Sequence, residues 1–479
     1  MSKAFNFPKV SVIFAFTFIS IILLAANGLS IKCHGEKVLK SQCMFNINST
    51  PLITSHHLEQ WNKPDNSRAE GPDNIYWNSL GAGITGPEAR VFSLEVFNSV
   101  VIAGGKFHVA GGVDVNSIAA WNGSSWLPIG SIGGIVHAMA VYNNELIVGG
   151  GFSAIGVTPA NRIAAWNGYE WSALGSGLND EVHSLVVYNN KLIAGGFFDM
   201  AGNVEAHRVA AWDGVSWEPM GAGFDGEHAG HSPDVCALAV YENSLIAGGR
   251  FTHTGTTEAI GIAAWDGAEW HRLGTGMGVE APYVQALEIY NGNLIAGGYF
   301  SSAGDAEAHG IAQWDGSSWS SMGDANFAVL ALATCGGRLV AGGHGQAGIS
   351  FPNNHIGSWN GIIWRDMGSG VTGGNENVYS MTIFNGMPII GGDFAMAGET
   401  TVNNIAQWNK WTYICGDFNN DQNINILDIV ALINYLYKNG PLSNHVDSAD
   451  VNSDLQLNIL DVVYLINYKY KSGPKPDCP

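Results

Sequence analysis

Two segments near the C-terminal end of the chain space oxygen-bearing side chains as a bound calcium ion requires. Ca²⁺ takes about six to eight oxygen ligands, which such loops supply from side chains at positions 1, 3, 5, 9 and 12 and from the carbonyl at position 7. The predicted ligand positions are Asp417, Asn419, Asp421, Asn423, Asn425 and Asp428 in the first loop, and Asp450, Asn452, Asp454, Gln456, Asn458 and Asp461 in the second. The pattern predicts two calcium ions. The alternative is a pair of Asx-rich turns that cap helices without metal.

An apolar-periodic stretch typical of a helix follows each loop, ending at Tyr437 and Tyr470. A loop and one helix, written twice, resembles a type I dockerin, the module that docks into cohesin domains on scaffold proteins or cell surfaces. The resemblance extends from Asp417 to about Gly473. Loop position 6, a glycine in this family, is Gln422 in the first loop and Leu455 in the second. A side chain at that sharp turn would weaken calcium binding.

Loop positions 10 and 11 help dockerins to choose their cohesin, and they are apolar in this chain. They are Ile426 and Leu427 in the first repeat and Ile459 and Leu460 in the second. Cellulosomal dockerins usually carry polar residues there. The resemblance implies a cohesin-like or cell-surface partner, and the apolar residues leave two alternatives open. They contact a different kind of partner, or they pack between the two helices and the rest of the chain.

A segment of about fifty residues is written seven times between Val91 and Trp411, a period typical of propeller blades. Each copy reads as four short strands, with a Gly-Gly doublet in the second. The doublets begin at Gly104, Gly149, Gly195, Gly248, Gly297, Gly342 and Gly391. We therefore predict a seven-bladed β-propeller followed by a small all-α calcium-binding domain.

Turn residues indicate which face of the predicted propeller carries a binding site. Asn291-Gly292 and Asp213-Gly214 are typical of tight hairpins, because their central residues need positive φ. The other two connections, from the second strand to the third and from blade to blade, are longer and vary between copies. Strand alternation places both on one face, where we expect recognition.

The last copy lacks its fourth strand after Trp408, and the segment from Ile75 to Gly81 fits as the missing one. The Gly-Gly, aromatic and Trp pattern resembles kelch and galactose-oxidase-like propellers, and still more the repeats of fungal cortical cell-polarity markers and of secreted bacterial proteins. This resemblance covers Ile75 to Trp411 and implies a fold rather than a function. Paired tryptophans such as Trp121 and Trp126 could stack on sugars, but residues repeated in every blade favour a scaffold role.

Histidines and carboxylates in the longer connections could form a transition-metal site. They are His207, His228, His231, His253 and His309, with Asp225, Glu227 and Asp234 between the third and fourth blades. The alternative is a set of solvated loop residues, which the lack of a recurring ligand spacing favours. Signatures such as Gly-x-Ser-x-Gly, His-Glu-x-x-His and a phosphate loop are absent from the sequence, so we predict no catalytic residue.

The N-terminal residues predict secretion. Lys3 and Lys9 precede the apolar run from Val10 to Ala26, which small residues follow, as in a secretory signal peptide; an uncleaved anchor is the alternative. We see no other run that is long and apolar enough to span a membrane. Cysteine positions agree with an oxidising compartment, with predicted disulfides Cys33–Cys43 and Cys415–Cys478 and predicted free thiols Cys236 and Cys335.

The predicted organisation is a signal peptide (1–28), a leader (29–74), the propeller (75–412) and the dockerin-like domain (413–479). With 21 basic and 41 acidic residues, the formal charge of -20 disfavours nucleic acid and anionic membrane surfaces. Two function classes follow. The first is a secreted, non-catalytic protein that recognises a glycan or protein through the propeller and attaches through the calcium-dependent tail. The alternative is an O-glycosyl hydrolase for polysaccharide breakdown, with two carboxylates from loop residues such as Asp225, Glu280 or Asp305.

Overall fold

The computed structural model describes residues 76–227, 230–278, 282–323, 328–344, 355–361, 364–409, 415–419, 424–438, 449–452, 454 and 456–476. All of them fall within the compact unit Pro64–Pro479. The predicted signal peptide (1–28) and the predicted leader (29–74) lie outside the described residues, as do Cys33, Cys43 and Cys478. Those domains and both disulfides therefore stay predictions.

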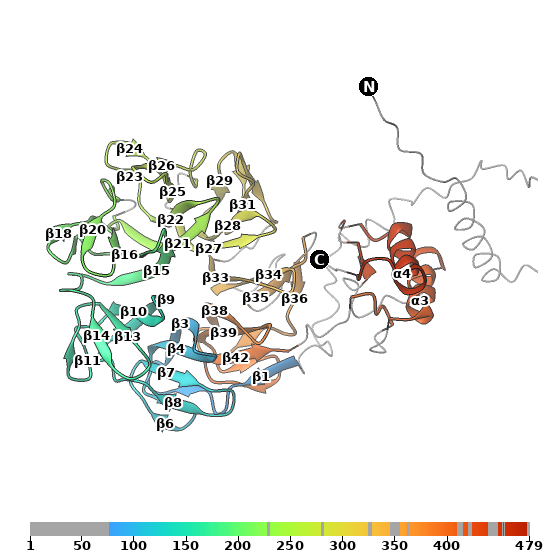
Figure 1. Ribbon diagram of the computed structural model, residues 1–479, viewed down its shortest axis with the longest axis horizontal. Helices are drawn as coiled ribbons and strands as arrows, with labels where there is room; N and C mark the ends of the chain where they lie inside the picture. The colour runs from blue at the N-terminus through green and yellow to red at the C-terminus, as the bar shows by residue number, and fades with distance from the viewer. Residues whose placement is uncertain are drawn as a thin grey trace, which may run out of the picture. The chain divides into compact units, whose positions relative to one another are not determined.

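Seven four-stranded antiparallel sheets form a ring, and we number them as blades one to seven (Figure 1). The strands of blades one to four, from innermost to outermost, are β3 (Arg90–Phe97), β4 (Val100–Lys106), β7 (Ile118–Trp121) and β8 (Trp126–Pro128); β9 (Ile135–Tyr142), β10 (Glu145–Gly151), β13 (Ile163–Trp166) and β14 (Trp171–Ala173); β15 (Val182–Tyr188), β16 (Lys191–Gly196), β19 (Val209–Trp212) and β20 (Trp217–Pro219); and β21 (Asp234–Tyr241), β22 (Ser244–Arg250), β25 (Ile262–Trp265) and β26 (Trp270–Arg272).

The remaining blades follow the same order, except that blade seven takes its outermost strand from the N-terminal side. Their strands are β27 (Tyr283–Tyr290), β28 (Asn293–Tyr299), β31 (Ile311–Trp314) and β32 (Trp319–Ser321); β33 (Ala328–Cys335), β34 (Arg338–His344), β35 (Ile356–Trp359) and β36 (Trp364–Asp366); and β38 (Asn377–Phe384), β39 (Met387–Asp393), β42 (Ile405–Trp408) and β1 (Trp77–Ser79). The fold is the predicted seven-bladed β-propeller.

Hairpin turns between the first two strands follow the sequence signal. Asn143 and Asn144 have φ of 49° and 62°, and Asn291 and Gly292 have φ of 48° and 81°. Positive φ at both central positions is the geometry of the type I′ turn, whose twist matches that of the strands it joins. Asparagine and glycine adopt this conformation at low cost, so the tight turns form where they were predicted.

The Gly-Gly doublets are required by close packing in two directions. A Cβ on Gly104 would lie 2.5 Å from Cγ1 of Val136 in the next blade, and a Cβ on Gly105 would lie 2.0 Å from the carbonyl oxygen of Arg90. The first glycine thus permits contact between blades, and the second permits contact between the first two strands of its own blade. Buried apolar clusters fill the same boundaries, each of them drawing residues from two neighbouring blades.

The tryptophan that opens each outermost strand links its blade to the preceding one. Trp126 Nε1 donates to the carbonyl of Leu80 at 2.8 Å, and Trp270 Nε1 donates to that of Met220 at 3.0 Å. Equivalent bonds are made by Trp77, Trp171, Trp217, Trp319 and Trp364. These contacts support the expectation that the repeated tryptophans are scaffold.

Ring closure occurs at the predicted place. β1 pairs with β42 in an antiparallel register that sets Trp77 opposite Trp408. Trp77 is 1% exposed, and its Nε1 donates to the carbonyl of Met367 in blade six at 2.9 Å. The first described strand therefore completes the last blade, and this pairing closes the ring.

The longer connections lie on one face, as predicted, but they are more regular than expected. In six blades the second and third strands are joined through a small hairpin with a positive-φ glycine in its turn, such as Gly111 at 58°. The hairpins are β5 (Val109–Ala110) with β6 (Val113–Asp114), β11 (Ala154–Ile155) with β12 (Thr158–Pro159), β17 (Met200–Ala201) with β18 (Val204–Glu205), β23 (His253–Thr254) with β24 (Thr257–Glu258), β29 (Ser302–Ala303) with β30 (Ala306–Glu307), and β40 (Met396–Ala397) with β41 (Thr400–Thr401). In blade six this connection includes residues 345–354, which lie outside the described residues.

The chain that enters a blade pairs with that blade's own hairpin. β2 (Ile84–Thr85) pairs with β5, and β37 (Val371–Thr372) pairs with β40. Single bridges such as Leu178 to Ala201 repeat this contact elsewhere. Both sets of long connections are thereby held together on the face from which the innermost strands begin. We call this the entry face.

Near the C-terminal end lie two helices, α3 (Ile426–Lys438) and α4 (Ile459–Lys471), which contact each other. Leu432 and Leu465 are fully buried in this small domain. Neither helix is long and apolar enough to cross a membrane, and this holds for all helices in the described residues.

Candidate functional site

The second calcium loop is organised around Asp461, its predicted last ligand. Asp461 is fully buried, and its two carboxylate oxygens accept hydrogen bonds from the backbone N–H groups of Val451 at 3.1 Å and Asn458 at 2.9 Å. Asp450, the predicted first ligand, is also buried, and its Oδ1 accepts from the N–H of Asp454 at 3.2 Å. The loop thus folds back on itself and brings its first and last carboxylates inward.

The first loop repeats this arrangement. Asp428 is fully buried and accepts from the N–H groups of Asn419 at 3.0 Å and Asn425 at 2.7 Å. Asp417 is buried as well. The predicted ligands Asp421 and Asn423 lie outside the described residues, so their positions stay predictions.

Asn425 and Asn458 cap the helices that follow. Asn425 Oδ1 accepts from the N–H of Leu427 at 2.7 Å, and Asn458 Oδ1 accepts from that of Leu460 at 2.8 Å. Asn458 and Asp461 form a reciprocal capping box. The side chains of Asn425 and Asn458 therefore do cap helices, as the alternative interpretation of the loops expects. Loop position 9 often reaches calcium through a water molecule, so capping does not conflict with metal binding.

The buried carboxylates fit a hard cation. Burial raises the pKa of Asp461 to about 6, and the negative charges of Asp450 and Asp454 add to this rise. Like charges brought together away from water repel each other unless a cation is bound between them. Oxygen atoms are the ligands that calcium prefers, so the donor set suits that ion.

The residues that could select the partner of this domain are exposed. Ile426 and Leu427 at the start of α3 are 43% and 56% exposed, and Ile459 and Leu460 at the start of α4 are 36% and 54% exposed. These side chains are therefore not packed away between the two helices. We call the four residues the apolar docking pairs.

A second cluster of polar residues, which the sequence analysis did not identify, lies at the centre of the propeller. The innermost strand of every blade carries one β-bulge, where the residue facing the Gly-Gly doublet is left out of the pairing. The bulge residues of blades one to seven are Phe92, His137, His183, Cys236, Gln285, Leu330 and Tyr379. Bulges re-aim side chains and are common next to functional sites.

Neighbouring bulge residues touch one another, because the innermost strands surround the axis of the ring. The ring centroid of Phe92 lies 5.0 Å from that of Tyr379 and 5.4 Å from that of His137. The ring centroids of His137 and His183 are 4.9 Å apart. The bulge residues of blades seven, one, two and three therefore form a continuous arc. Blades two and three contribute the two histidines of this arc.

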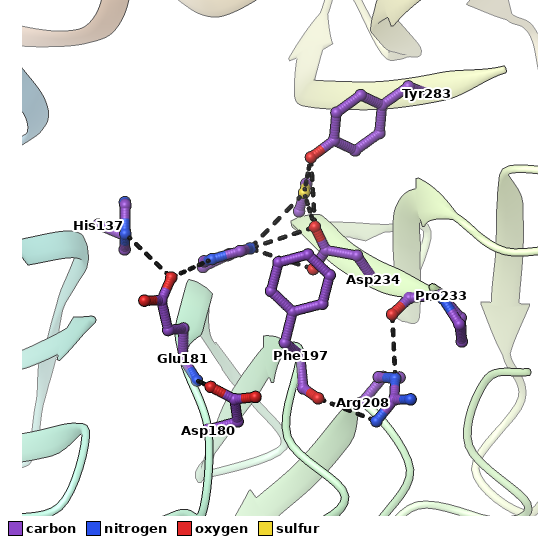
Figure 2. A network of polar contacts seen from close by, with 10 residues as sticks. His137, Asp180, Glu181, Phe197, Arg208, Pro233, Asp234 and Tyr283 are labelled. Carbon is purple, nitrogen blue, oxygen red and sulfur yellow. Dashed lines mark hydrogen bonds and ion pairs between the residues drawn. The ribbon is translucent and has the colours of Figure 1, made fainter. Parts of the chain in front are cut away.

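A polar network joins Glu181, Asp234 and Tyr283 (Figure 2), and His183 lies at its centre. Its Nδ1 lies 3.1 Å from Oδ1 of Asp234, and its Nε2 lies 3.3 Å from Oε2 of Glu181. The same Glu181 oxygen lies 3.5 Å from Nε2 of His137. On the other side, Cys236 Sγ and the Tyr283 hydroxyl both donate to Asp234 Oδ2, at 2.9 Å and 3.2 Å. Four blades thus contribute to one cluster of polar contacts.

The cluster lies at the entry face, since Asp234 and Tyr283 are the first residues of their strands and Glu181 precedes β15. Backbone contacts fix these positions. The carbonyl of Glu181 accepts from the N–H of Phe197 at 2.9 Å, and a Cβ on Gly196 would lie 2.1 Å from that carbonyl oxygen. The Gly-Gly doublet therefore lets the backbone at Glu181, just before β15, approach β16 closely.

The charges within the cluster depend on one another. Burial works to lower the pKa of His183, but Asp234, Cys236 and Glu181 outweigh it and raise that pKa to about 12. His137 and His183 in turn hold the pKa of Glu181 well below its usual range. Burial raises the pKa of the Cys236 thiol to about 12, assisted by the charge of Asp234. These contacts favour the protonated form of His183, which lies between two carboxylates.

The histidines predicted in the longer connections do not come together. His207 contacts Glu205 at 3.4 Å, His309 contacts Glu307 at 3.5 Å, and His253 bonds to Thr252 Oγ1 at 2.8 Å. None of these belongs to a group of three ligating side chains among the described residues, and neither does His231. His228 and Glu280 lie outside the described residues. Asp234 was assigned to a connection, which is wrong, because it begins β21 and is fully buried.

A signal for the central cluster is present in the sequence. In each repeat the bulge residue follows a valine and stands at the same distance before the doublet, as Phe92 does before Gly104 and Tyr379 before Gly391. Its neighbours are repeated, whereas its own chemistry changes from blade to blade. The bulge position is thus the variable position within an otherwise repeated innermost strand, and an alignment of the seven copies reveals it.

Comparison with known proteins found one family match and several solved structures that are similar at low identity. Residues 415–468 match the family described as Dockerin type I domain. No curated protein matches the chain. Solved structures similar to it include the WD40 β-propeller domain of Doa1, with 14% identity, 69% of this chain and 95% of that chain covered, and a TM-score of 0.44. Another is YCF48 bound to D1 peptide, with 13% identity, coverage of 71% and 97%, and a TM-score of 0.43.

These structural likenesses carry no functional argument, and the resemblance to the kelch and galactose-oxidase-like type stays an expectation. The free thiols predicted at Cys236 and Cys335 are confirmed. Taken together, the duplicated loop-helix geometry, the family match and the seven sheets lead to one conclusion: residues 415–468 are a type I dockerin domain, and the chain before them forms a seven-bladed β-propeller.

Proposed function

We propose that this protein is a secreted, non-catalytic binding protein. In this proposal the entry face of the propeller recognises a glycan or a protein, and the dockerin domain, with two bound calcium ions, attaches the chain to a cohesin-like or cell-surface protein. The exposed apolar docking pairs are the observation that carries it. Dockerin domains bind cohesins, and an exposed apolar surface present at equivalent positions of both repeats is suited to such contact.

Calcium dependence follows from how the docking pairs are held. The N–H of Leu427 donates to Asn425, whose own N–H donates to the buried Asp428, and Leu460, Asn458 and Asp461 repeat this chain of contacts. Loss of calcium would leave buried carboxylates without a counter-ion and would unfold the loops. The docking pairs would then lose their common orientation.

A cohesin-binding assay with the full chain tests the attachment. The double variant Leu427→Ser/Leu460→Ser should raise the Kd at least about tenfold, because a leucine side chain contributes about 1.5 kcal/mol or more when it is buried. The matched control is Tyr437→Ser/Tyr470→Ser, which changes residues that are 49% and 58% exposed at the opposite helix ends. A calcium chelator should abolish binding. Unchanged binding of the leucine variant to a panel of cohesins and cell-wall preparations would contradict the proposal.

The connection between β20 and β21 supports recognition at the entry face. Arg208 holds this connection, since its Nε donates to the carbonyl of Pro233 at 3.0 Å and its Nη1 donates to that of Phe197 at 2.9 Å. An end of the connection that is fixed beside the central cluster suits a preformed recognition surface. Replacing residues 222–232 with the shorter connection before blade five should abolish binding on a glycan and protein array. Circular dichroism should show an unchanged fold.

A hydrolysis assay on the same glycans tests the enzyme alternative. The structure brings Glu181 and Asp234 to opposite sides of one histidine. If the purified protein hydrolyses a polysaccharide and either Glu181→Gln or Asp234→Asn abolishes the hydrolysis, the non-catalytic proposal fails. An O-glycosyl hydrolase would then take its place, since such enzymes act through two carboxylates.

A further inference from the structure

We propose that His137, Glu181 and His183 bind a divalent transition-metal ion of the zinc type at the axis of the propeller, with one coordination position left open. Each of the three side chains offers one ligand atom, and these atoms all lie within 4.8 Å of one another. The site is separate from the calcium loops and does not rest on the proposed attachment or recognition.

The two distances from Glu181 to the histidines suit tetrahedral coordination. Zinc bonds of about 2.0–2.1 Å to nitrogen and oxygen place tetrahedral ligand atoms about 3.3 Å apart. Glu181 Oε2 lies 3.5 Å from Nε2 of His137 and 3.3 Å from Nε2 of His183. Two imidazoles and one carboxylate are also a ligand set that zinc and similar ions accept, with a fourth position for water or for an oxygen atom of a bound ligand.

His137 provides an independent observation. Its Nε2 is buried and makes no hydrogen bond. The Oε2 atom of Glu181 lies 3.5 Å from this nitrogen. A buried ring nitrogen without a hydrogen bond is uncommon and costs stability. A metal ion between His137 and Glu181 would satisfy it.

The other nitrogen of His183 has the partner that a metal ligand needs. Histidines that bind metal through Nε2 usually donate Nδ1–H to a carboxylate, which sets the orientation of the ring. Asp234 occupies that position at 3.1 Å, and its second oxygen is held by Cys236 and Tyr283. Asp234 is fully buried, so this support is rigid.

Blade two leaves room for the carboxylate. The residue after the Gly-Gly doublet is Gly151 only in this blade; elsewhere it is Lys106, Phe197, Arg250, Tyr299, His344 or Asp393. A Cβ on Gly151 would lie 2.7 Å from Oε1 of Glu181. Gly151 thus lets Glu181 reach between the two histidines, a detail that the propeller scaffold itself does not require.

A second group of side chains, His183, Asp234 and Cys236, also brings ligand atoms within 4.8 Å. It is the weaker candidate on geometry. Cys236 Sγ lies 3.9 Å from Nδ1 of His183, and its hydrogen bond goes to Asp234. Using Nδ1 as a ligand would also remove the carboxylate support that His183 has in the first arrangement.

Metal binding is tested on the full chain in excess calcium, which occupies the dockerin loops. Dialysis against Zn²⁺ followed by elemental analysis should show a single zinc ion per chain. Co²⁺ in its place should give the intense visible absorption of a tetrahedral site. His137→Ala and Glu181→Gln should each weaken Zn²⁺ binding at least about tenfold, and Asp234→Asn should weaken it about 10- to 100-fold through loss of the outer carboxylate.

Gly151→Ala is the sharpest variant, because it displaces the Glu181 carboxylate without removing a ligand. It should also weaken Zn²⁺ binding at least about tenfold. The matched control is His207→Ala, which removes a histidine from a similar His–Glu contact of 3.4 Å that has no third ligand. This control should bind Zn²⁺ as the unaltered protein does, and thermal unfolding should confirm that all variants are folded.

Three results would overturn the proposal. Absence of bound zinc in the folded, unaltered chain would mean that a proton on His183 is the only cation of this cluster. Zinc binding that survives both His137→Ala and Gly151→Ala would place the ion elsewhere. A thiolate-to-cobalt charge-transfer band that disappears in Cys236→Ser would assign the metal to the second group.

Discussion

Gly391 in blade seven packs directly against Val91 in blade one: a Cβ built on Gly391 would lie 2.5 Å from Cγ1 of Val91. The same contact, at the same 2.5 Å, joins Gly104 to Val136 between blades one and two. The ring therefore closes with the packing that it uses between its other blades. This boundary also depends on residues from distant parts of the chain, which makes it sensitive to small changes in volume.

Gly391→Ala should lower the free energy of unfolding by about 1–3 kcal/mol, because an added methyl group must displace both Val91 and its own blade's Ser380. Denaturant unfolding followed by tryptophan fluorescence measures this. Gly133→Ala is the control, since a Cβ there meets nothing within 4 Å. The control should change stability by less than about 0.5 kcal/mol. Equal effects of the two variants would show that closure does not depend on this contact.

Trp77→Ala should destabilise the propeller by about 3–5 kcal/mol, the usual cost of removing a buried aromatic side chain. It removes the hydrogen bond to Met367 and the edge contact with Trp408, whose ring centroid lies 4.8 Å away. Tyr169→Ala, at a side chain that is 96% exposed, provides the comparison. Removing the whole segment 75–81 should cause aggregation. A stable, soluble truncation would contradict the closure scheme.

Asp417→Ala and Asp450→Ala should each reduce bound calcium from two ions to one. Both residues are buried first ligands of their loops, and each loop holds its own buried last ligand, so the sites are expected to load separately. Equilibrium dialysis of the full chain with labelled calcium measures the stoichiometry. An unaltered chain that binds no calcium would leave only the helix-capping role for these loops.

The loss of folding stability at low pH should depend on the Asp-Gly turns. Backbone N–H groups donate to Asp266 and Asp315 and lower the pKa of each to about 2, from a usual value of 3.8. A lowered folded-state pKa gives stability that is present above pH 4 and is lost as pH falls toward 2. Asn122 makes the same turn in blade one without titrating, accepting from the N–H of Ser125 at 2.8 Å.

Asp266→Asn/Asp315→Asn should therefore keep the turns and flatten the loss of stability between about pH 4 and pH 2. Thermal midpoints measured across that range check this. The variant and the unaltered chain should respond alike above pH 5, where these carboxylates are ionised in both the folded and the unfolded state. If the loss of stability between about pH 4 and pH 2 is unchanged by the substitutions, other carboxylates control it.

The sequence predicted much of this fold because its repeated features are local. Asn143-Asn144 and its counterparts encode hairpins through φ alone, and Gly104 and the other doublets mark close approaches that no other residue allows. Helix caps and calcium ligands likewise lie within one loop, as Asp450 and Asp461 do. Such signals need no knowledge of distant contacts, so spacing is enough to recognise them.

The central cluster could not be recognised in that way. His137, Glu181, Asp234 and Tyr283 are spread over four blades, and although they occupy recurring repeat positions, their spacing along the chain does not show that they touch. They meet only because seven innermost strands surround one axis and each strand bulges at the same height. The histidines of the longer connections do not join this cluster; His207 and His309, for example, lie beside the local carboxylates of Glu205 and Glu307.

By itself, the sequence determined the blade count, the tight turns and the tail of two loop-helix repeats, because all of these are set by short-range geometry, and it predicts which residues would hold calcium. The tertiary structure decided which of the remaining polar residues share a site. It also decided that Ile426, Leu427, Ile459 and Leu460 are exposed. The physical reason is the same in both cases: burial and side-chain convergence depend on which strands and helices become neighbours, and that is settled only when the ring closes and the helices pack.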